Sequence, residues 1–111
     1  MIPVVLETPY AGEVEANVEF AQKCMHDMLL RGEAPYASHL LYTQSNVLND
    51  LIPEERKLGS AAGFVWKPMV GVKSVAYFDR DMSGGMRQAK DYCIEHNLVW
   101  EERYLFEENG I

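Results

Sequence analysis

The sequence has few cysteines and no pattern typical of a metal site. Its two cysteines, Cys24 and Cys93, both fall in helical patterns and lie far apart along the 111-residue chain. We therefore expect two buried thiols rather than a disulfide or a metal-binding pair. The three histidines are scattered and have no cysteine or carboxylate at ligand spacing, so we expect neither a metal nor another cofactor.

Long hydrophobic runs and basic residues are also scarce. The N-terminal "MIPVVLETPY" has neither the basic start nor the long apolar region of a signal peptide, and no run approaches membrane-spanning length. We expect a cytoplasmic protein without a membrane partner. Ten basic residues against 17 acidic ones give a net charge of −7, which argues against nucleic acid as a partner. A small anionic ligand is compatible with this charge, because one local pocket can oppose the overall sign.

The apolar fraction is 48%, enough for a hydrophobic core, and the chain contains no repeat or linker. A single domain over residues 1–111 follows. The patterns predict alternating elements: strand 4–7, helix 13–31, strand 34–38, a helix from Pro53 to residue 66, strand 71–78, a helix after Ser83 and strand 98–105. This β-α-β-α-β-α-β order predicts an α/β fold with a four-stranded parallel sheet and helices on both faces.

Helical periodicity assigns an inner face to each predicted helix, and Gly32 is placed to end the first one in the left-handed conformation. The residues expected on these inner faces are Val14, Val18, Ala21, Met25, Met28 and Leu29 in the first helix, Leu58, Ala61, Ala62 and Val65 in the second, and Met86, Ala89, Cys93 and Ile94 in the third.

Ligands of such sheets bind beyond the carboxyl ends of the strands, where the strand order reverses. The loops at residues 7–13, 38–46 and 79–87 should meet there. In the first loop, Tyr10 offers an aromatic face, and Gly12 lets the backbone approach a ligand. Alternatively, Pro9 and Gly12 only form a turn and Tyr10 packs on the edge of the sheet. In the second, His39 either points into the crevice or serves as a structural side chain.

The third loop, "DRDMSGGMR", gives the strongest indication of a ligand-binding site. Ser83, Gly84 and Gly85 open a helix whose first N–H groups and dipole favour an anion. Arg87 on the first turn is placed to add a charge-assisted contact to a phosphate. Asp79 and Asp81 either hold sugar hydroxyls or turn the chain through their own side chains.

Four segments taken in order carry a resemblance: "TPYAGEVEANVEFA", "GEAPYASHLLYTQ", "PEERKLG" and "DMSGGMRQAKDY". Together they resemble small, uncharacterised phage and bacterial domains of the nucleoside 2-deoxyribosyltransferase-like superfamily. The resemblance covers nearly the whole chain. It implies a flavodoxin-like three-layer sandwich, a homo-oligomer, and a pocket for a nucleoside or nucleotide, with Met86 of the Ser-x-Gly-Met motif among the ligand-binding residues.

The chain departs from that superfamily at one position. In the active transferases a glutamate directly after a Gly-Met pair attacks the anomeric carbon of the sugar, whereas here Arg87 follows Gly85 and Met86. Arginine stays protonated and cannot attack carbon, so double displacement through this position is excluded. Either Glu7, Asp79 or Asp81 activates water for hydrolysis of an N-glycosidic bond, or the pocket binds without cutting.

The sequence therefore leaves three functions open. The favoured one is a protein that binds, and sequesters, a nucleotide or phosphorylated nucleoside. The alternatives are an N-glycosidic bond hydrolase or deoxyribosyltransferase, and a protein-interaction module that uses the acidic C-terminal residues 101–111.

Overall fold

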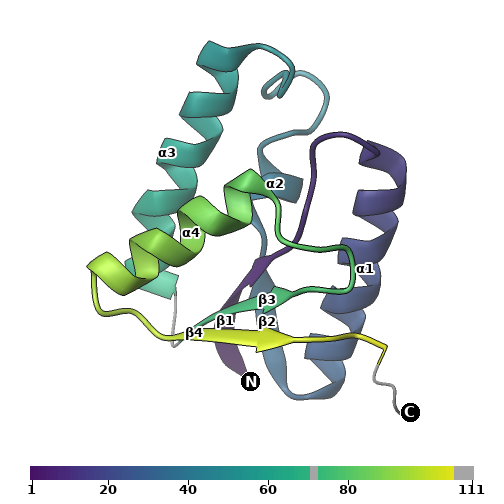
Figure 1. Cartoon of the computed structure of the whole chain (residues 1–111), viewed down its shortest axis with the longest axis vertical. Helices are drawn as coiled ribbons and strands as arrows, with labels where there is room; N and C mark the ends of the chain where they lie inside the picture. Colours follow the sequence, from purple (N-terminus) through teal and green to yellow (C-terminus); the bar gives the residue numbers. More distant parts are fainter. Residues whose placement is uncertain (71–72, 107–111) are drawn as a thin grey trace.

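The computed structural model describes residues 1–70 and 73–106 (Figure 1). Four strands form one sheet in the order β2-β1-β3-β4, with every neighbouring pair parallel. The start of the predicted strand 71–78 and residues 107–111 of the acidic C-terminal segment lie outside the described residues. The elements in chain order are β1 (Ile2–Glu7), α1 (Val14–Leu30), β2 (Glu33–Tyr36), α2 (Ser38–Leu41), α3 (Pro53–Val70), β3 (Ser74–Tyr77), α4 (Gly84–Glu95) and β4 (Trp100–Arg103).

The predicted fold is confirmed: the chain is an α/β protein with a four-stranded parallel sheet between helices, a flavodoxin-like three-layer arrangement. β4 lies at an edge of the sheet, as its charged residues suggest. The addition to the predicted order is α2, a single helical turn after β2. Within residues 1–70 and 73–106, no helix combines the length and the apolar character needed to span a membrane.

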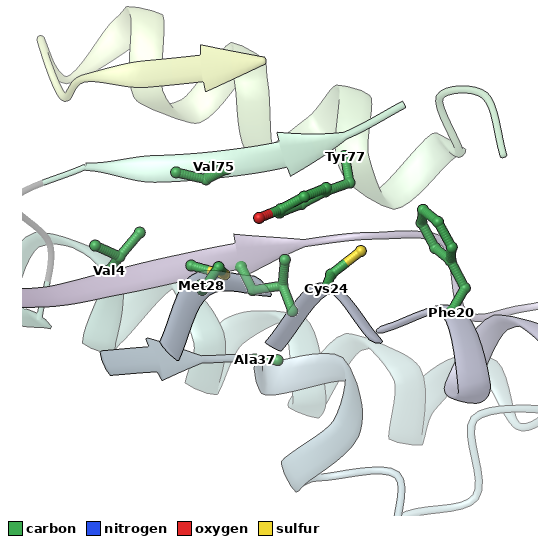
Figure 2. Packing of buried hydrophobic residues seen from close by; sticks show 8 residues of the cluster. Val4, Phe20, Cys24, Met28, Ala37, Val75 and Tyr77 are labelled. Atoms are coloured by element: carbon green, nitrogen blue, oxygen red, sulfur yellow. The ribbon is translucent and has the colours of Figure 1, made fainter. Parts of the chain in front are cut away.

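Side chains of the two central strands alternate between the faces of the sheet. Val4 and Leu6 of β1 and Val75 and Tyr77 of β3 pack with α1 in the main core cluster. Figure 2 shows Val4, Val75 and Tyr77 close to the labelled side chains of the helix. The residues between these on β1 and β3 point to the opposite face of the sheet, because successive side chains of a strand alternate in direction. There Ser74 lies 3.6 Å from the thiol of Cys93 on α4. Both cysteines are buried free thiols, as predicted.

The inner face of α1 was predicted correctly at Ala21 and Met28 and wrongly at its two ends. Its buried residues are Asn17, Phe20, Ala21, Cys24 and Met28, whereas Val14 and Leu29 are exposed. Phe20 is the largest apolar side chain of the helix, and its burial turns the helix so that the valine and leucine at the two ends leave the core. Gly32 has φ +82° after the helix, as predicted.

The inner face of α3 was also predicted wrongly. Leu58 and Val65 are 62% and 59% exposed, and the face turned inward carries Gly59, Gly63 and Lys67. A Cβ atom on Gly63 would lie 2.8 Å from the Ser38 hydroxyl oxygen, so α3 approaches α2 along a side that has no room for side chains. Close helix packing through glycine decided the orientation, and the apolar side chains were left outside.

The prediction for α4 holds for Met86, Ala89 and Cys93, which are buried. Ile94 is 63% exposed, so its predicted burial was wrong. It directly follows Cys93, and one residue along a helix turns a side chain by about 100° away from the face that packs on the sheet.

Candidate functional site

A pocket of about 480 Å³ opens at the carboxyl ends of the central strands. Its size is in the range of small-molecule sites. All three predicted loops contribute to it, and α3 supplies a further wall that the sequence analysis did not foresee. The main lining residues are Glu7, Thr8 and Tyr10 after β1, Ser38, His39 and Tyr42 around α2, Gly59, Gly63 and Lys67 on α3, and Ser83, Gly84, Gly85 and Met86 at the start of α4.

The pocket gathers seven of the eleven predicted site residues: Glu7, Tyr10, His39, Ser83, Gly84, Gly85 and Met86. The other four lie outside its lining. Arg87 is exposed on the first turn of α4. Gly12 borders a neighbouring hollow of about 640 Å³ formed with the loop at residues 43–51.

The two predicted aspartates of the third loop take part in chain geometry. Both carboxylate oxygens of Asp79 accept hydrogen bonds from backbone N–H groups after β4, at 2.8 Å from Leu105 and 3.0 Å from Phe106. Asp81 is exposed and has φ +68°, in the left-handed region that aspartate adopts in turns. Glu7 is thus the member of the three predicted carboxylates that lines the pocket.

An ion pair between Glu7 and Lys67 lies against the pocket. The two residues are 8% and 5% exposed, and the Lys67 ammonium also lies 5.9 Å from the centre of the Phe64 ring. Burial lowers the pKa of Lys67 to about 8. Sequence reasoning missed Lys67, although its spacing of four residues from Gly63 and eight from Gly59 places all three on one side of a helix.

A hydrogen bond of 2.7 Å joins the hydroxyl of Thr8 to Nε2 of His39 beside this pair. Burial lowers the pKa of His39 to about 4, so the imidazole is neutral at pH 7. A neutral ring donates through one nitrogen and accepts through the other, which suits it to hydroxyl groups rather than to a phosphate charge. Thr8 was also missed, although it directly follows β1, where a side chain meets the pocket.

The first turn of α4 presents backbone amides to the same space. Ser83 is the N-cap, as predicted, and its hydroxyl accepts from the Met86 N–H at 3.1 Å. Gly84 and Gly85 follow in the first turn, where N–H groups have no partner within the helix. Because neither glycine carries a side chain, a ligand can approach these amides closely.

The side chain of Asn17 on α1 holds the loop that follows β1. Its amide nitrogen donates to the carbonyls of Tyr10 and Ala11 at 3.0 Å and 3.2 Å, and its oxygen accepts from Arg80 at 2.7 Å. Asn17 is buried on α1, so these bonds tie the loop to a rigid element. The position of Tyr10 at the pocket is therefore determined by the core helix.

Charges at the mouth of the pocket are mixed. Asp50 and Glu55 line it together with Arg56, whose Nε donates to the Asp50 carbonyl at 3.0 Å and lies 3.7 Å from its carboxylate. The Arg56 side chain is 53% exposed, in contrast to the buried Lys67. Arg56, rather than Arg87, is therefore the solvent-accessible cation of the described lining.

Comparison with known proteins identifies a family. A family model described as "Domain of unknown function (DUF7768)" matches residues 3–103, so the chain belongs to this family. No curated protein matches the chain, and no solved structure does.

Proposed function

We propose that this member of the family binds a nucleotide or a phosphorylated nucleoside in the pocket at the carboxyl ends of its strands. The observation that carries the proposal is the lining itself. One space of about 480 Å³ combines a helix N-terminus, aromatic side chains, hydroxyl groups and a buried carboxylate. These four kinds of group match the phosphate, the base and the sugar of one ligand.

The phosphate is assigned to the first turn of α4. The amides of Gly84 and Gly85 and the helix dipole attract an anion, and a phosphate held there leaves the rest of the ligand to extend along the pocket. Arg56 takes the role of the cation, because it lines the pocket whereas Arg87 does not. The acidic neighbours Asp50 and Glu55 limit the tolerated charge, which favours a monophosphate over a triphosphate.

The sugar and the base are assigned to the remaining walls. The carboxylate of Glu7 accepts hydrogen bonds, and the Thr8–His39 pair offers both a donor and an acceptor to sugar hydroxyls. Tyr10 and Tyr42 border the opening with aromatic rings that suit the face of a base. Binding without turnover agrees with the absence of a glutamate after Gly85 and Met86.

The assignment of the cation predicts that two arginine variants behave differently. We expect Arg56→Gln to weaken the binding of a nucleoside monophosphate by about 10- to 100-fold, the value of one charge-assisted hydrogen bond. The same change should leave the affinity for the unphosphorylated nucleoside nearly unaltered. The matched variant Arg87→Gln should change neither affinity. Isothermal titration calorimetry with each nucleoside and its monophosphate measures all four values.

Two results would contradict this assignment. Equal losses for nucleoside and monophosphate in Arg56→Gln would remove Arg56 from the phosphate site. If no heat of binding were measured with any nucleoside or nucleoside monophosphate of a complete panel, the proposed ligand class would be wrong.

A second candidate function is hydrolysis of an N-glycosidic bond with Glu7 as the base that activates water. It is favoured by one observation: Glu7 lines the pocket, whereas Asp79 is bound to backbone amides and Asp81 is exposed. A buried carboxylate beside a sugar also stabilises the positive charge that develops in the transition state.

This candidate predicts release of free base from a nucleotide panel incubated with the pure protein. Glu7→Gln should then slow release by at least about 100-fold, as expected for the loss of a general base. Asp81→Asn should retain full turnover. Release is measured by chromatography, and circular dichroism verifies that each variant is folded, since Glu7→Gln also removes the charge partner of Lys67. Turnover that survives in folded Glu7→Gln, or no release at all, would eliminate the candidate.

A further inference from the structure

Lys67 lines the pocket but has no part in the binding proposed above. It lies in the last turn of α3 and is 5% exposed, with its ammonium paired to Glu7 at the end of β1 and 5.9 Å from the centre of the Phe64 ring. Stability alone is a weak reason for such a pair, because apolar side chains of similar volume often stabilise a fold as well or better. Its position in the lining of a cavity indicates a chemical role.

The Glu7–Lys67 pair can supply a neutral amine. An ammonium cannot attack carbon, whereas the free amine of a desolvated lysine is a nucleophile. The charge of Glu7 favours the ammonium, and burial opposes it by lowering the pKa of Lys67 to about 8. Transfer of the proton to Glu7 leaves two uncharged groups, the form that burial favours. The pair therefore holds a nucleophile beside a carboxyl group that stores its proton.

We propose that Lys67 forms an imine with the aldehyde group of a phosphorylated sugar in its open-chain form. Glu7 takes the ammonium proton, Nζ attacks the carbonyl carbon, and the carbonyl oxygen is protonated through Glu7 to a hydroxyl. The carbon–oxygen bond then breaks and the hydroxyl leaves as water with the proton from Glu7. The nitrogen lone pair closes a protonated imine beside the Glu7 carboxylate. The step requires neither an oxidant nor a reductant.

The groups around the pair favour an aldehyde over other electrophiles. Attack of the amine on an acyl group would end in a stable amide and block the site, whereas water reverses an imine. Thr8 directly follows Glu7, and its hydroxyl lies 2.7 Å from Nε2 of His39. Burial keeps this imidazole neutral, so the Thr8–His39 pair can bind the carbonyl oxygen or a neighbouring hydroxyl without adding charge. The carboxylate of Glu7 stabilises the positive imine.

The first turn of α4 selects a phosphorylated aldehyde. The amides of Gly84 and Gly85 line the same cavity as Lys67, and a helix N-terminus attracts an anion. A cavity of about 480 Å³ has room for a sugar phosphate whose two ends meet these two groups. This part of the inference rests on the phosphate site of the proposed function. The imine itself requires no nucleoside, so the two can be tested separately.

Reductive trapping of the full chain tests the imine. The protein is incubated near pH 7 with glyceraldehyde 3-phosphate and sodium cyanoborohydride, which converts an imine into a stable secondary amine, and peptide mass mapping locates the label. We expect Lys67 to be labelled at least about 10-fold faster than the other lysines, whose ordinary pKa of about 10.4 leaves much less free amine. These internal controls are Lys23, Lys57, Lys73 and Lys90. A rate at Lys67 no higher than theirs, or no label at Lys67, would overturn the proposal.

A charge-conserving variant identifies the reacting group. Lys67→Arg keeps a positive partner for Glu7, but its guanidinium stays protonated and cannot attack carbon. The fast label should disappear in this variant, whereas the matched Lys90→Arg should retain it. Circular dichroism verifies that both variants are folded, and mapping of the wild-type label decides the question even if Lys67→Arg does not fold. A fast label that persists in Lys67→Arg would overturn the proposal.

A second probe separates this inference from the proposed function. Unphosphorylated glyceraldehyde should label Lys67 at least about 10-fold more slowly than its phosphate, the value of one charge-assisted contact. Equal rates for the two probes would overturn the assignment to a phosphorylated substrate. Fast trapping at Lys67 in a protein that binds no nucleotide by calorimetry would support the imine and contradict only the nucleotide. Nucleotide binding without trapping at Lys67 would overturn the imine alone.

Discussion

Replacing Arg103 by methionine should lower the free energy of unfolding by about 3–5 kcal/mol, the loss seen when one partner of a buried ion pair is removed. The Arg103 side chain is 9% exposed and makes a two-pronged contact with Glu33, with Nη1 2.8 Å from Oε1 and Nη2 2.6 Å from Oε2. It also donates to Tyr77 at 3.3 Å. Without the guanidinium, the Glu33 carboxylate would stay buried with only Lys73 at 3.5 Å to balance it.

A neighbouring ion pair of β4 provides the control. Lys90 lies 2.9 Å from Glu102, and both side chains are more than a third exposed, so Lys90→Met should cost less than about 1 kcal/mol. Urea unfolding monitored by circular dichroism measures both variants. Equal losses in the two would mean that burial of the Glu33–Arg103 pair contributes nothing to stability.

The pH dependence of the Arg103→Met effect gives a second check. The hydrogen bond and charge of Arg103 hold the pKa of Glu33 below its usual value. A lowered carboxyl pKa adds stability above the pKa of the unfolded chain, and this contribution is lost as pH falls through the folded value. The gap between wild type and Arg103→Met should therefore narrow on acidification below about pH 4. A gap that is constant with pH would show that lost packing, not the ion pair, causes the effect.

The layers of the fold were predictable from sequence, because apolar residues recur at different spacings in strands and helices, and the two kinds of segment alternate along the chain. The Glu33–Arg103 contact was not predictable, although Arg103 falls in a predicted strand and Glu33 directly precedes one. They lie on the two edge strands, β2 and β4, and their long side chains meet across one face of the sheet, where the usual twist of parallel strands brings diagonal corners closer. Such a pairing depends on the accumulated twist of four strands, which no local pattern encodes.

The orientation of α3 shows the limit of periodicity more directly. The apolar stripe around Leu58 and Val65 is a clear pattern, and the interpretation that it faces the core was wrong. The glycines at 59 and 63 were the competing signal. They allow backbone approach to α2, and the gain from close packing outweighs the cost of leaving the stripe exposed.

Convergence of the loops was predictable from topology, but the choice of side chains within them was not. Gly84, Gly85 and Met86 line the pocket whereas Arg87 does not, because each residue turns the helix by about 100° and Met86 is already directed inward. Lys67 and Arg56 were missed because α3 was not recognised as a wall of the pocket. Its position follows from contacts with α2, whose residues were predicted to lie in the loop at 38–46.

The Glu7–Lys67 pair should show strong coupling in a double-mutant cycle. Glu7→Leu and Lys67→Met should each lower the free energy of unfolding by about 3–5 kcal/mol, because each leaves one buried charge alone. The double variant should recover most of that loss, to within about 1–2 kcal/mol of wild type, since two apolar side chains replace two desolvated ions. Urea unfolding measures the cycle.

A surface ion pair serves as the control for this cycle, and a binding measurement tests what the buried pair does in the pocket. Glu19 and Lys23 lie 3.8 Å apart with side chains 68% and 57% exposed, so their cycle should give a coupling of less than about 1 kcal/mol. The double variant of Glu7 and Lys67 should fold but bind nucleoside monophosphate weakly, because its pocket has lost the Glu7 carboxylate that is assigned to the sugar. If the two single losses simply add in the double variant, the ions are not paired in solution. If the double variant binds nucleoside monophosphate as tightly as wild type does, the Glu7–Lys67 pair contributes to stability alone. The sugar must then be held by other residues, first of all by Thr8 and His39.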